Sequence, residues 1–357
     1  MNSKKHIDFT GQNLYISIDV HKRSWLVTIR LNGYRLESYS SDPSPGQLSK
    51  HVKHRYPKAN YYCVYEAGFS GFWIQRQLES FGIQTIIVNP ADVPTKDKEK
   101  KQKNDRVDSQ KLARELESGN LEGIYIPDIL IEQIRSLNRL RYQLVKDRSR
   151  VKNRIKCYLM FTGKTLPEEF EGVKWSQKLS NYLRGLEFEH IAGQETLNYS
   201  LEYLESLSQR IKQIENRMEE IISGNKDYKQ IVDRIDGIPG MGFITAVTFF
   251  TEIININRFK SFDQLCCFVG LVPSVHSSGD KQIVLGLQKR QNKYLKNMLI
   301  ESAWVAVRKD PALMSCYGKL IKRMPKQKAI IKIAKKLLNR LRYIWLNNKE
   351  YKYAVVA

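Results

Sequence analysis

The first 90 residues alternate between short apolar runs and a segment with helical spacing. The runs are rich in β-branched and aromatic residues and follow the two-residue alternation of strands, whereas residues 72–81 have helical periodicity. Gly68 and Gly71 separate the two kinds of pattern. The alternation predicts an α/β domain. Its expected strands cover residues 14–20, 25–29 and 61–66, with 34–39 as a further candidate and a short apolar run at 84–88.

Helical patterns dominate much of the remaining chain. After a lysine-rich loop at 91–103, residues 105–118 are expected to form one helix, and the pattern is helical from about residue 129 to residue 222. Between Leu197 and Ile221 the apolar residues step mostly by threes and fours, which is the spacing of a coiled-coil seam. The same stripe also fits an internal helical hairpin, so it predicts either self-association or packing within one chain.

A glycine-rich turn lies near the start of the C-terminal region, which begins near Lys226. Gly240 and Gly242 precede the apolar segment 243–250, and the arrangement resembles one helix-hairpin-helix turn. Glycines of this kind allow backbone N–H groups to approach a phosphate, which makes these two residues candidate nucleic-acid contacts. They also permit a tight turn between helices without any such contact.

The chain is strongly basic. Its 59 Lys and Arg residues against 37 Asp and Glu residues give a formal net charge of +22, and a surface of this kind binds polyanions. Sixteen of the basic residues lie between positions 289 and 342, where the acidic residues are Glu301 and Asp310. The sequence contains neither a run of about 18 apolar residues nor a signal-peptide pattern. A cytoplasmic protein that does not enter a membrane is therefore expected.

Four carboxylates are candidates for a metal site. Asp19 and Glu66 each end an apolar strand, and Asp105 and Asp108 project from one face at the start of a predicted helix. Each acid has a simpler explanation by itself, because a helix N-terminus favours Asp and a strand end is often the first solvated position. The four together favour a Mg²⁺ site, since hard divalent cations prefer several oxygen ligands. Mn²⁺ is the alternative ion.

Two adjacent serines lie in an expected loop at residues 270–281. Either Ser277 or Ser278 could attack a phosphate, but a serine hydroxyl needs a base, a metal ion or a phosphate-binding environment to do so. His276 is a candidate base, although a lone histidine is more often a polar surface residue. The basic residues that could bind phosphate in this region are Lys281, Lys289, Arg290 and Lys293.

The order and spacing of these motifs resemble those of the DEDD transposases of bacterial insertion sequences. These enzymes form the insertion-sequence family one-ten, which includes the pilin-gene invertases. The resemblance extends from Leu14 to about Ala306. Ser17 departs from the family pattern, because a glycine often precedes the first acid motif, and Gln291 also replaces a common glycine. The matching segments are Ile18-Asp19-Val20-His21-Lys22, Glu66, Asn104-Asp105-Arg106-Val107-Asp108, Ile238-Pro239-Gly240-Met241-Gly242 and Ser277-Ser278-Gly279.

The resemblance implies a three-domain recombinase that moves an insertion sequence. The expected domains are an α/β RNase H-like (RuvC-like) domain at 1–125, an α-helical coiled-coil connector at 126–225, and a mainly α-helical serine transposase domain with a helix-hairpin-helix-like element at 226–357. By position, Ser278 is the nucleophile that becomes linked to a DNA phosphate, with Ser277 as the alternative. The catalytic and metal-binding acids would be Asp19, Glu66, Asp105 and Asp108.

The resemblance also implies partners. Double-stranded DNA at the element ends and target is expected, and members of the family that have been studied in detail use a structured RNA from the element to pair with both DNAs. Recombining two duplexes makes a homodimer or a homotetramer plausible.

Two other functions fit the same residues. A junction-resolving or structure-selective nuclease would use the four acids and water without a covalent intermediate. A non-catalytic nucleic-acid-binding protein would use only the basic C-terminal half.

Overall fold

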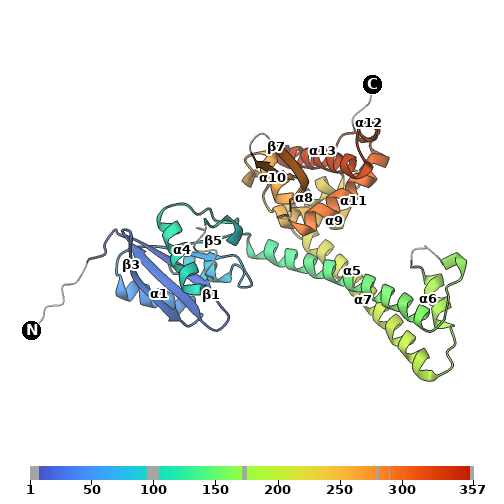
Figure 1. Ribbon diagram of the computed structural model, residues 1–357, viewed down its shortest axis with the longest axis horizontal. Helices are drawn as coiled ribbons and strands as arrows, with labels where there is room; N and C mark the ends of the chain where they lie inside the picture. The colour runs from blue at the N-terminus through green and yellow to red at the C-terminus, as the bar shows by residue number, and fades with distance from the viewer. Residues whose placement is uncertain (1–7, 95–103, 171–174, 279–280, 289, 354–357) are drawn as a thin grey trace, which may run out of the picture. The chain divides into compact units, whose positions relative to one another are not determined.

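The chain divides into two compact units, Met1–Ile126 and Pro127–Ala357. The computed structural model describes residues 8–94, 104–170, 175–278, 281–288 and 290–353, and it describes residues 274–278 and 281–285 by their backbone alone. The first unit is built around a sheet, and the second is mostly helical (Figure 1).

The first unit contains a mixed sheet of five strands in the order β3-β2-β1-β4-β5. β1 pairs in parallel with β4, which pairs in parallel with β5, whereas β2 and β3 are antiparallel. This arrangement confirms the predicted α/β unit and is compatible with an RNase H-like DEDD transposase. The elements are β1 (Asn13–Val20), β2 (Trp25–Leu31), β3 (Tyr34–Ser41), α1 (Pro45–Arg55), β4 (Asn60–Glu66), α2 (Trp73–Ser80), β5 (Gln84–Val88), η1 (Pro90–Asp92) and α4 (Asp105–Glu117).

The two faces of this sheet differ in character. Leu14, Ile16 and Ile18 are fully buried in a core that also contains apolar side chains of α1 and α2. Because side chains alternate along a strand, Ser17 and Asp19 face the opposite side. On that side α4 packs against β1, β2 and β4. Every residue of β1 that shares the face of Asp19 is therefore directed toward the α4 side.

The second unit is mostly helical, as expected, but the predicted helical stretch 129–222 is not continuous. It is interrupted between α5 and α7, where Gly163 adopts a φ of +68° that favours glycine. The elements are α5 (Ile129–Phe161), η2 (Glu168–Phe170), α6 (Gln177–Arg184), α7 (Ile191–Ser223), α8 (Lys226–Asp236), α9 (Phe243–Ile253), η3 (Ile256–Arg258), α10 (Phe262–Val269), β6 (Pro273–Ser278), β7 (Lys281–Leu287), α11 (Lys293–Lys309), α12 (Pro311–Ile321) and α13 (Lys326–Asn347).

The apolar stripe of α7 packs within the chain. α5 and α7 lie side by side as two long helices (Figure 1). Leu197, Leu201 and Leu204 are at most 4% exposed and share a core with Val151 and Ile155 of α5. The internal hairpin that the spacing allowed is thus present, and these leucines are not free to form a seam with a second copy.

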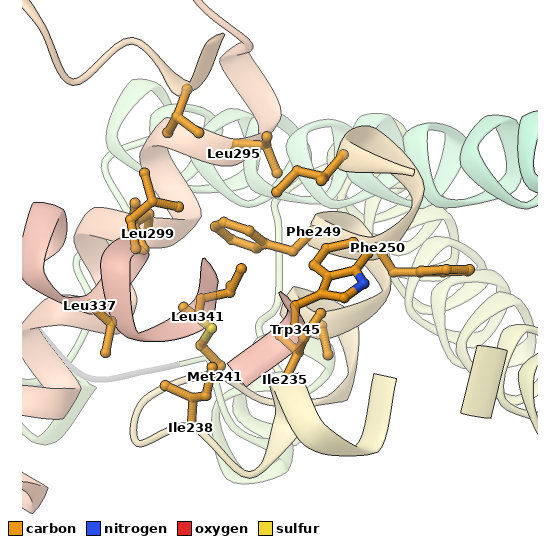
Figure 2. Packing of buried hydrophobic residues seen from close by; sticks show 14 of the residues in the cluster. Ile235, Ile238, Met241, Phe249, Phe250, Leu295, Leu299, Leu337, Leu341 and Trp345 are labelled. Carbon is orange, nitrogen blue, oxygen red and sulfur yellow. The ribbon is translucent and has the colours of Figure 1, made fainter. Parts of the chain in front are cut away.

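The remaining helices enclose a second hydrophobic core (Figure 2). Phe249 and Phe250 of α9 contribute its central aromatic rings, and the ring centroids of Phe250 and Trp345 are 6.3 Å apart. The spacing of apolar residues along α13 explains its burial, because one helical face is apolar while Lys326, Lys328 and Lys332 are exposed. Other members of this core are Ile235, Ile238, Met241, Leu295, Leu299, Leu337 and Leu341.

The expected loop at 270–281 was predicted incorrectly in part. Residues Pro273–Ser278 form β6, which pairs with β7 in an antiparallel hairpin. The sequence of β7 explains the strand, since Ile283, Val284 and Leu285 have the residue types typical of strands. The candidate serines therefore lie on a strand.

Gly240 is required by close packing. It has a φ of +84°, and a Cβ at this position would lie 2.2 Å from the carbonyl oxygen of Ser302 in α11. Gly242 has a φ of −112° as the N-cap of α9, and a Cβ there would meet nothing within 4 Å. Gly240 therefore allows the backbone of this turn to contact the backbone of α11, and Gly242 leaves the start of α9 open.

Replacing Gly240 should destabilise the second unit. Gly240→Ala combines an unfavourable φ with a backbone clash, and we expect a loss of about 2–4 kcal/mol in the free energy of unfolding. Gly242→Ala is the matched control and should cost about 1 kcal/mol or less. Urea unfolding of both variants measures the difference, and equal losses would contradict the packing role of Gly240.

Candidate active site

The two strand acids lie at the ends of neighbouring parallel strands, where Asp19 is the penultimate residue of β1 and Glu66 is the last residue of β4. Ile18 of β1 is paired with Tyr65 of β4, so the next residue of each strand, Asp19 and Glu66, lies at the same edge of the sheet. Both also lie on the α4 side, because Ser17 and Val64, two residues earlier, are buried under that helix. The sheet thus delivers both carboxylates to one place.

The helix acids approach from the start of α4. Asn104 caps the helix, since its side-chain oxygen accepts a hydrogen bond from the Arg106 N–H at 3.0 Å. Asp105 is the first helical residue and is 63% exposed, whereas Asp108, one turn later, is 32% exposed. The lysine-rich segment before the cap lies largely outside the described residues.

A buried hydroxyl network fixes α4 on the sheet. Ser17 donates to the backbone oxygen of Ser109 at 2.6 Å, and the two hydroxyl oxygens are 3.0 Å apart. The Ser109 hydroxyl also lies 2.9 Å from that of Thr28 in β2. All three residues are fully buried. Ser17, which departs from the family pattern, is therefore a direct attachment point for the helix that carries Asp105 and Asp108.

The other end of α4 has its own attachment. One carboxylate oxygen of Glu117 accepts a hydrogen bond from Arg30 Nε at 2.6 Å, and the other accepts one from the Gly33 N–H at 2.6 Å. Ser109 attaches the middle of α4 to the sheet, and Glu117 attaches its C-terminal end. These two attachments determine the direction of the first turn of the helix.

Asp19 and Asp105 both lie close to His21. The Nε2 atom of His21 lies 3.2 Å from Asp19 Oδ2 and 3.4 Å from Asp105 Oδ2. One ligand atom from each of these three residues lies within 4.8 Å of the others. Among the described residues, Glu66 and Asp108 are not part of that group, and Asp108 forms an ion pair with the buried Lys111 at 3.2 Å.

Electrostatics at Asp19 favour a bound cation. Burial raises the pKa of the Asp19 carboxyl above its ordinary value, and the charges of Asp105 and Asp108 raise it further, whereas His21 lowers it. A divalent cation reverses this penalty, because it stabilises the ionised carboxylate and neutralises the repulsion between neighbouring acids. The donor set of carboxylate oxygens with one imidazole nitrogen fits a divalent metal ion.

Sequence reasoning gave no role to His21. The sequence feature that could have identified His21 is its position two residues after Asp19, because residues at this spacing at the end of a strand are directed to the same side. This position alone does not indicate a metal ligand. The indication comes from the fold, in which α4 brings Asp105 close to the same nitrogen atom.

The serine hairpin lies in the second unit. Ser277 is paired with Gln282, and Ser278 is paired with Lys281 across the two strands. Backbone hydrogen bonds from Gln288 N to Val272 O and from Asn292 N to Phe268 O, both 3.0 Å long, close the base of the hairpin. The two candidate nucleophiles therefore lie at the tip of a hairpin with a fixed base.

A buried ion pair holds the segment that follows the hairpin. Glu252 of α9 is 2% exposed and accepts hydrogen bonds from Arg139 of α5 at 2.7 and 2.8 Å. Asn292, the N-cap of α11, donates to the same carboxylate at 2.8 Å. Helices from distant parts of the sequence thus converge on the start of α11.

The predicted phosphate-binding residues have different surroundings. Lys293 is the exposed first residue of α11, and its Nζ lies 5.1 Å from the ring centroid of Tyr294. Arg290 is exposed as well, and Lys281 begins β7. Lys289 lies outside the described residues. Gly242 leaves the N-terminus of α9 open, whereas Gly240 packs closely against the backbone of α11.

Part of the basic charge of α5 is neutralised within the chain. Arg139 pairs with Glu252, Arg141 pairs with Glu215 at 2.7 Å, and Arg150 pairs with Asp147 at 2.8 Å. The exposed lysines of α13 extend along the face opposite its buried one. Ion pairs within the chain therefore reduce the positive charge that α5 offers to a polyanion, whereas α13 presents exposed lysines.

Comparison with known proteins assigns both parts of the chain to transposases. Residues 16–163 match the profile of the IS110-type DEDD transposases, and residues 232–318 match the profile described as Transposase IS116/IS110/IS902 family. The first match includes the four acids, and the second includes the serine hairpin. These matches define the chain as a DNA transposase.

Three relatives show the extent of the similarity. The putative transposase y4qE of Sinorhizobium fredii is 27% identical over 81% of this chain and 71% of its own length. The transposase for insertion sequence element IS1111A of Coxiella burnetii is 28% identical over 68% of this chain and 64% of its own length. The putative transposase y4rJ of S. fredii is 26% identical over 91% and 90%. The chain belongs to the IS110 family of DEDD transposases, which use divalent metal ions, commonly Mg²⁺, and act on DNA.

Within the part of the chain that the structure describes, no helix combines the length and the apolar character needed to cross a membrane.

The hydroxyl network should contribute measurably to the stability of the first unit. Ser109→Ala removes a hydroxyl and leaves the buried Thr28 hydroxyl short of a partner, so we expect a loss of about 1–2 kcal/mol in the free energy of unfolding. The control is Ser118→Ala at the exposed C-cap of the same helix, which should change it by less than about 0.5 kcal/mol. Urea unfolding compares the two, and equal effects would rule out the anchoring role.

Proposed function

We propose that this transposase moves an insertion sequence by site-specific recombination, with four carboxylates that bind Mg²⁺ and a serine that becomes covalently linked to DNA. The observation that carries the proposal is that Asp19 and Asp105 bring carboxylate oxygens close together on the α4 side of the sheet, with Glu66 at the end of the neighbouring strand and Asp108 one turn further along α4. The second matched region of the same chain contains the serine hairpin. Mn²⁺ is the alternative ion.

The acids have a common role. Asp19 and Asp105 offer oxygens close enough to share one ion. Glu66 lies beside Asp19 at the strand ends, and Asp108 affects Asp19 through its charge. A bound Mg²⁺ would act as a Lewis acid at a phosphate oxygen and would help to activate the attacking oxygen. The protein's contribution is to hold the carboxylates on a rigid sheet and helix before the ion arrives.

Ser278 is the proposed nucleophile, with Ser277 as the alternative. Its Oγ forms a bond to the scissile phosphorus, the P–O bond to one side of the DNA strand breaks, the hydroxyl proton leaves to a base, and the departing DNA oxygen takes up a proton. In the reverse reaction a DNA hydroxyl displaces the serine. The phosphodiester energy is kept in the phosphoserine link, so ATP is not needed. Lys281, which is paired with Ser278 across the hairpin, would bring positive charge to the phosphate.

The nucleic-acid partners are proposed from charge. Double-stranded element ends and target DNA would bind through basic residues near the hairpin, with Gly242 leaving the start of α9 open to a phosphate as in a helix-hairpin-helix element. The candidates near the hairpin are Lys281, Lys289, Arg290 and Lys293. Gly240, which packs closely against α11, would stabilise the turn that precedes α9. An element-encoded structured RNA would guide the choice of target, and the exposed lysines of α13 provide additional positive surface.

The proposed organisation keeps three functional parts. Residues 1–125 would form the RuvC-like DEDD domain, residues 126–225 the coiled-coil region, and residues 226–357 the serine transposase domain. The active assembly would be a homodimer or a homotetramer, because recombination joins two duplexes. Any contact between copies must use surfaces other than the buried leucines of α7.

The covalent intermediate provides the test. Purified protein is incubated with Mg²⁺, labelled element-junction DNA and the RNA transcribed from the element flank, and then separated by denaturing electrophoresis. We expect label on the protein, its loss in Ser278→Ala, its retention in Ser277→Ala, and a decrease of at least about 100-fold in Asp105→Asn. Omitting the RNA should abolish the adduct.

Each other outcome supports a different account. Adducts that persist in Ser278→Ala would remove the serine assignment. Cleaved DNA with free ends and no adduct would identify a metal-dependent nuclease. Binding without cleavage in the complete mixture would identify a nucleic-acid-binding protein.

A further inference from the structure

His21 lies where a ligand of the metal ion would lie. It follows β1 directly, two residues after Asp19, and its side chain is 50% exposed. Asp105 reaches the same nitrogen from the first position of α4. Three side chains from a strand, the turn after it and a helix therefore place one donor atom each around a common point.

The hydrogen bond between His21 and Asp19 accounts for only one of the two carboxylate contacts of this histidine. An N–H···O hydrogen bond is usually 2.7–3.2 Å long, and a single Nε2 proton points toward one acceptor at a time. Here Nε2 is 3.2 Å from one carboxylate oxygen and 3.4 Å from the other. The first distance lies at the limit of that range, and the second lies beyond it.

The same distances suit ligands that share one cation. Donor atoms bound to an ion at about 2.1 Å are separated by roughly 3.0 Å at neighbouring octahedral positions and by roughly 3.4 Å at tetrahedral positions. Both nitrogen–oxygen distances fall close to these values. The side chains are thus spaced for coordination without a large rearrangement.

We propose, on the basis of the metal site in the proposed function, that His21 is a direct ligand of the divalent ion together with Asp19 and Asp105. The site then contains an imidazole nitrogen among carboxylate oxygens. Imidazole suits transition-metal ions better than it suits Mg²⁺, which prefers oxygen ligands and keeps its waters. His21 therefore makes the site bind Mn²⁺ more tightly than Mg²⁺.

Pulsed electron paramagnetic resonance tests this role without relying on activity. Mn²⁺ alone is added to the metal-free protein, and the electron spin echo is examined for modulation from a directly coordinated ¹⁴N nucleus. We expect this modulation in the wild-type protein and in His54→Gln, an exposed histidine on α1 that serves as the matched control. It should disappear in His21→Gln, which retains the carboxylates.

Binding constants give the second measurement. Titration calorimetry should show the dissociation constant for Mn²⁺ rising about tenfold or more in His21→Gln, while that for Mg²⁺ changes by less than about threefold. His54→Gln should change neither constant. Because His21 is half-exposed, its replacement should leave the thermal unfolding of the protein unchanged, which is checked on the same samples.

The outcomes separate this inference from the metal site on which it depends. Mn²⁺ binding that is lost in Asp19→Asn and Asp105→Asn, but without ¹⁴N modulation in the wild type, would keep the metal site and overturn the role of His21. Nitrogen modulation that persists in His21→Gln would also overturn it. Binding that is unchanged in both aspartate variants would remove the proposed metal site itself, and the role of His21 with it.

Discussion

The attachment of α4 to the polar face of the five-stranded sheet is the interaction on which the candidate metal site depends. The strands bring Asp19 and Glu66 to one edge of the sheet, but they supply only two of the acids. The hydroxyl network of Ser17 and Ser109 determines where the first turn of α4 lies, and hence where Asp105 approaches Asp19. A buried polar network defines one arrangement more strictly than apolar packing, because a shift of the helix breaks hydrogen bonds that water cannot replace.

A different polar contact organises the serine region. The carboxylate of Glu252 is shared by Arg139 of α5 and Asn292 at the start of α11, immediately after the hairpin that carries Ser277 and Ser278. Since a buried carboxylate is costly without such partners, these three residues are expected to stay together. The long helix α5 thus has a structural role at the base of the serine region, and part of its positive charge serves the fold.

Local patterns were sufficient for much of the fold and for the candidate acids. Alternating apolar residues predicted the strands of the first unit, and the spacing of Asp105 and Asp108 placed both on one helix face. The partner of the α7 stripe could not be predicted, because the same periodicity fits either α5 or a second copy. The contact of Gly240 with Ser302 and the approach of His21 to Asp105 depend on residues far apart in the sequence. No local spacing encodes such contacts.

The central claim is that the α4 side of the sheet edge binds a catalytic divalent ion. X-ray diffraction from crystals soaked in Mn²⁺, recorded at a wavelength where manganese scatters anomalously, locates the ion directly. The account predicts an anomalous peak about 2.1–2.3 Å from carboxylate oxygens of both Asp19 and Asp105. A peak bound to other residues, with the carboxylates of Asp19 and Asp105 contacting only solvent, would contradict it.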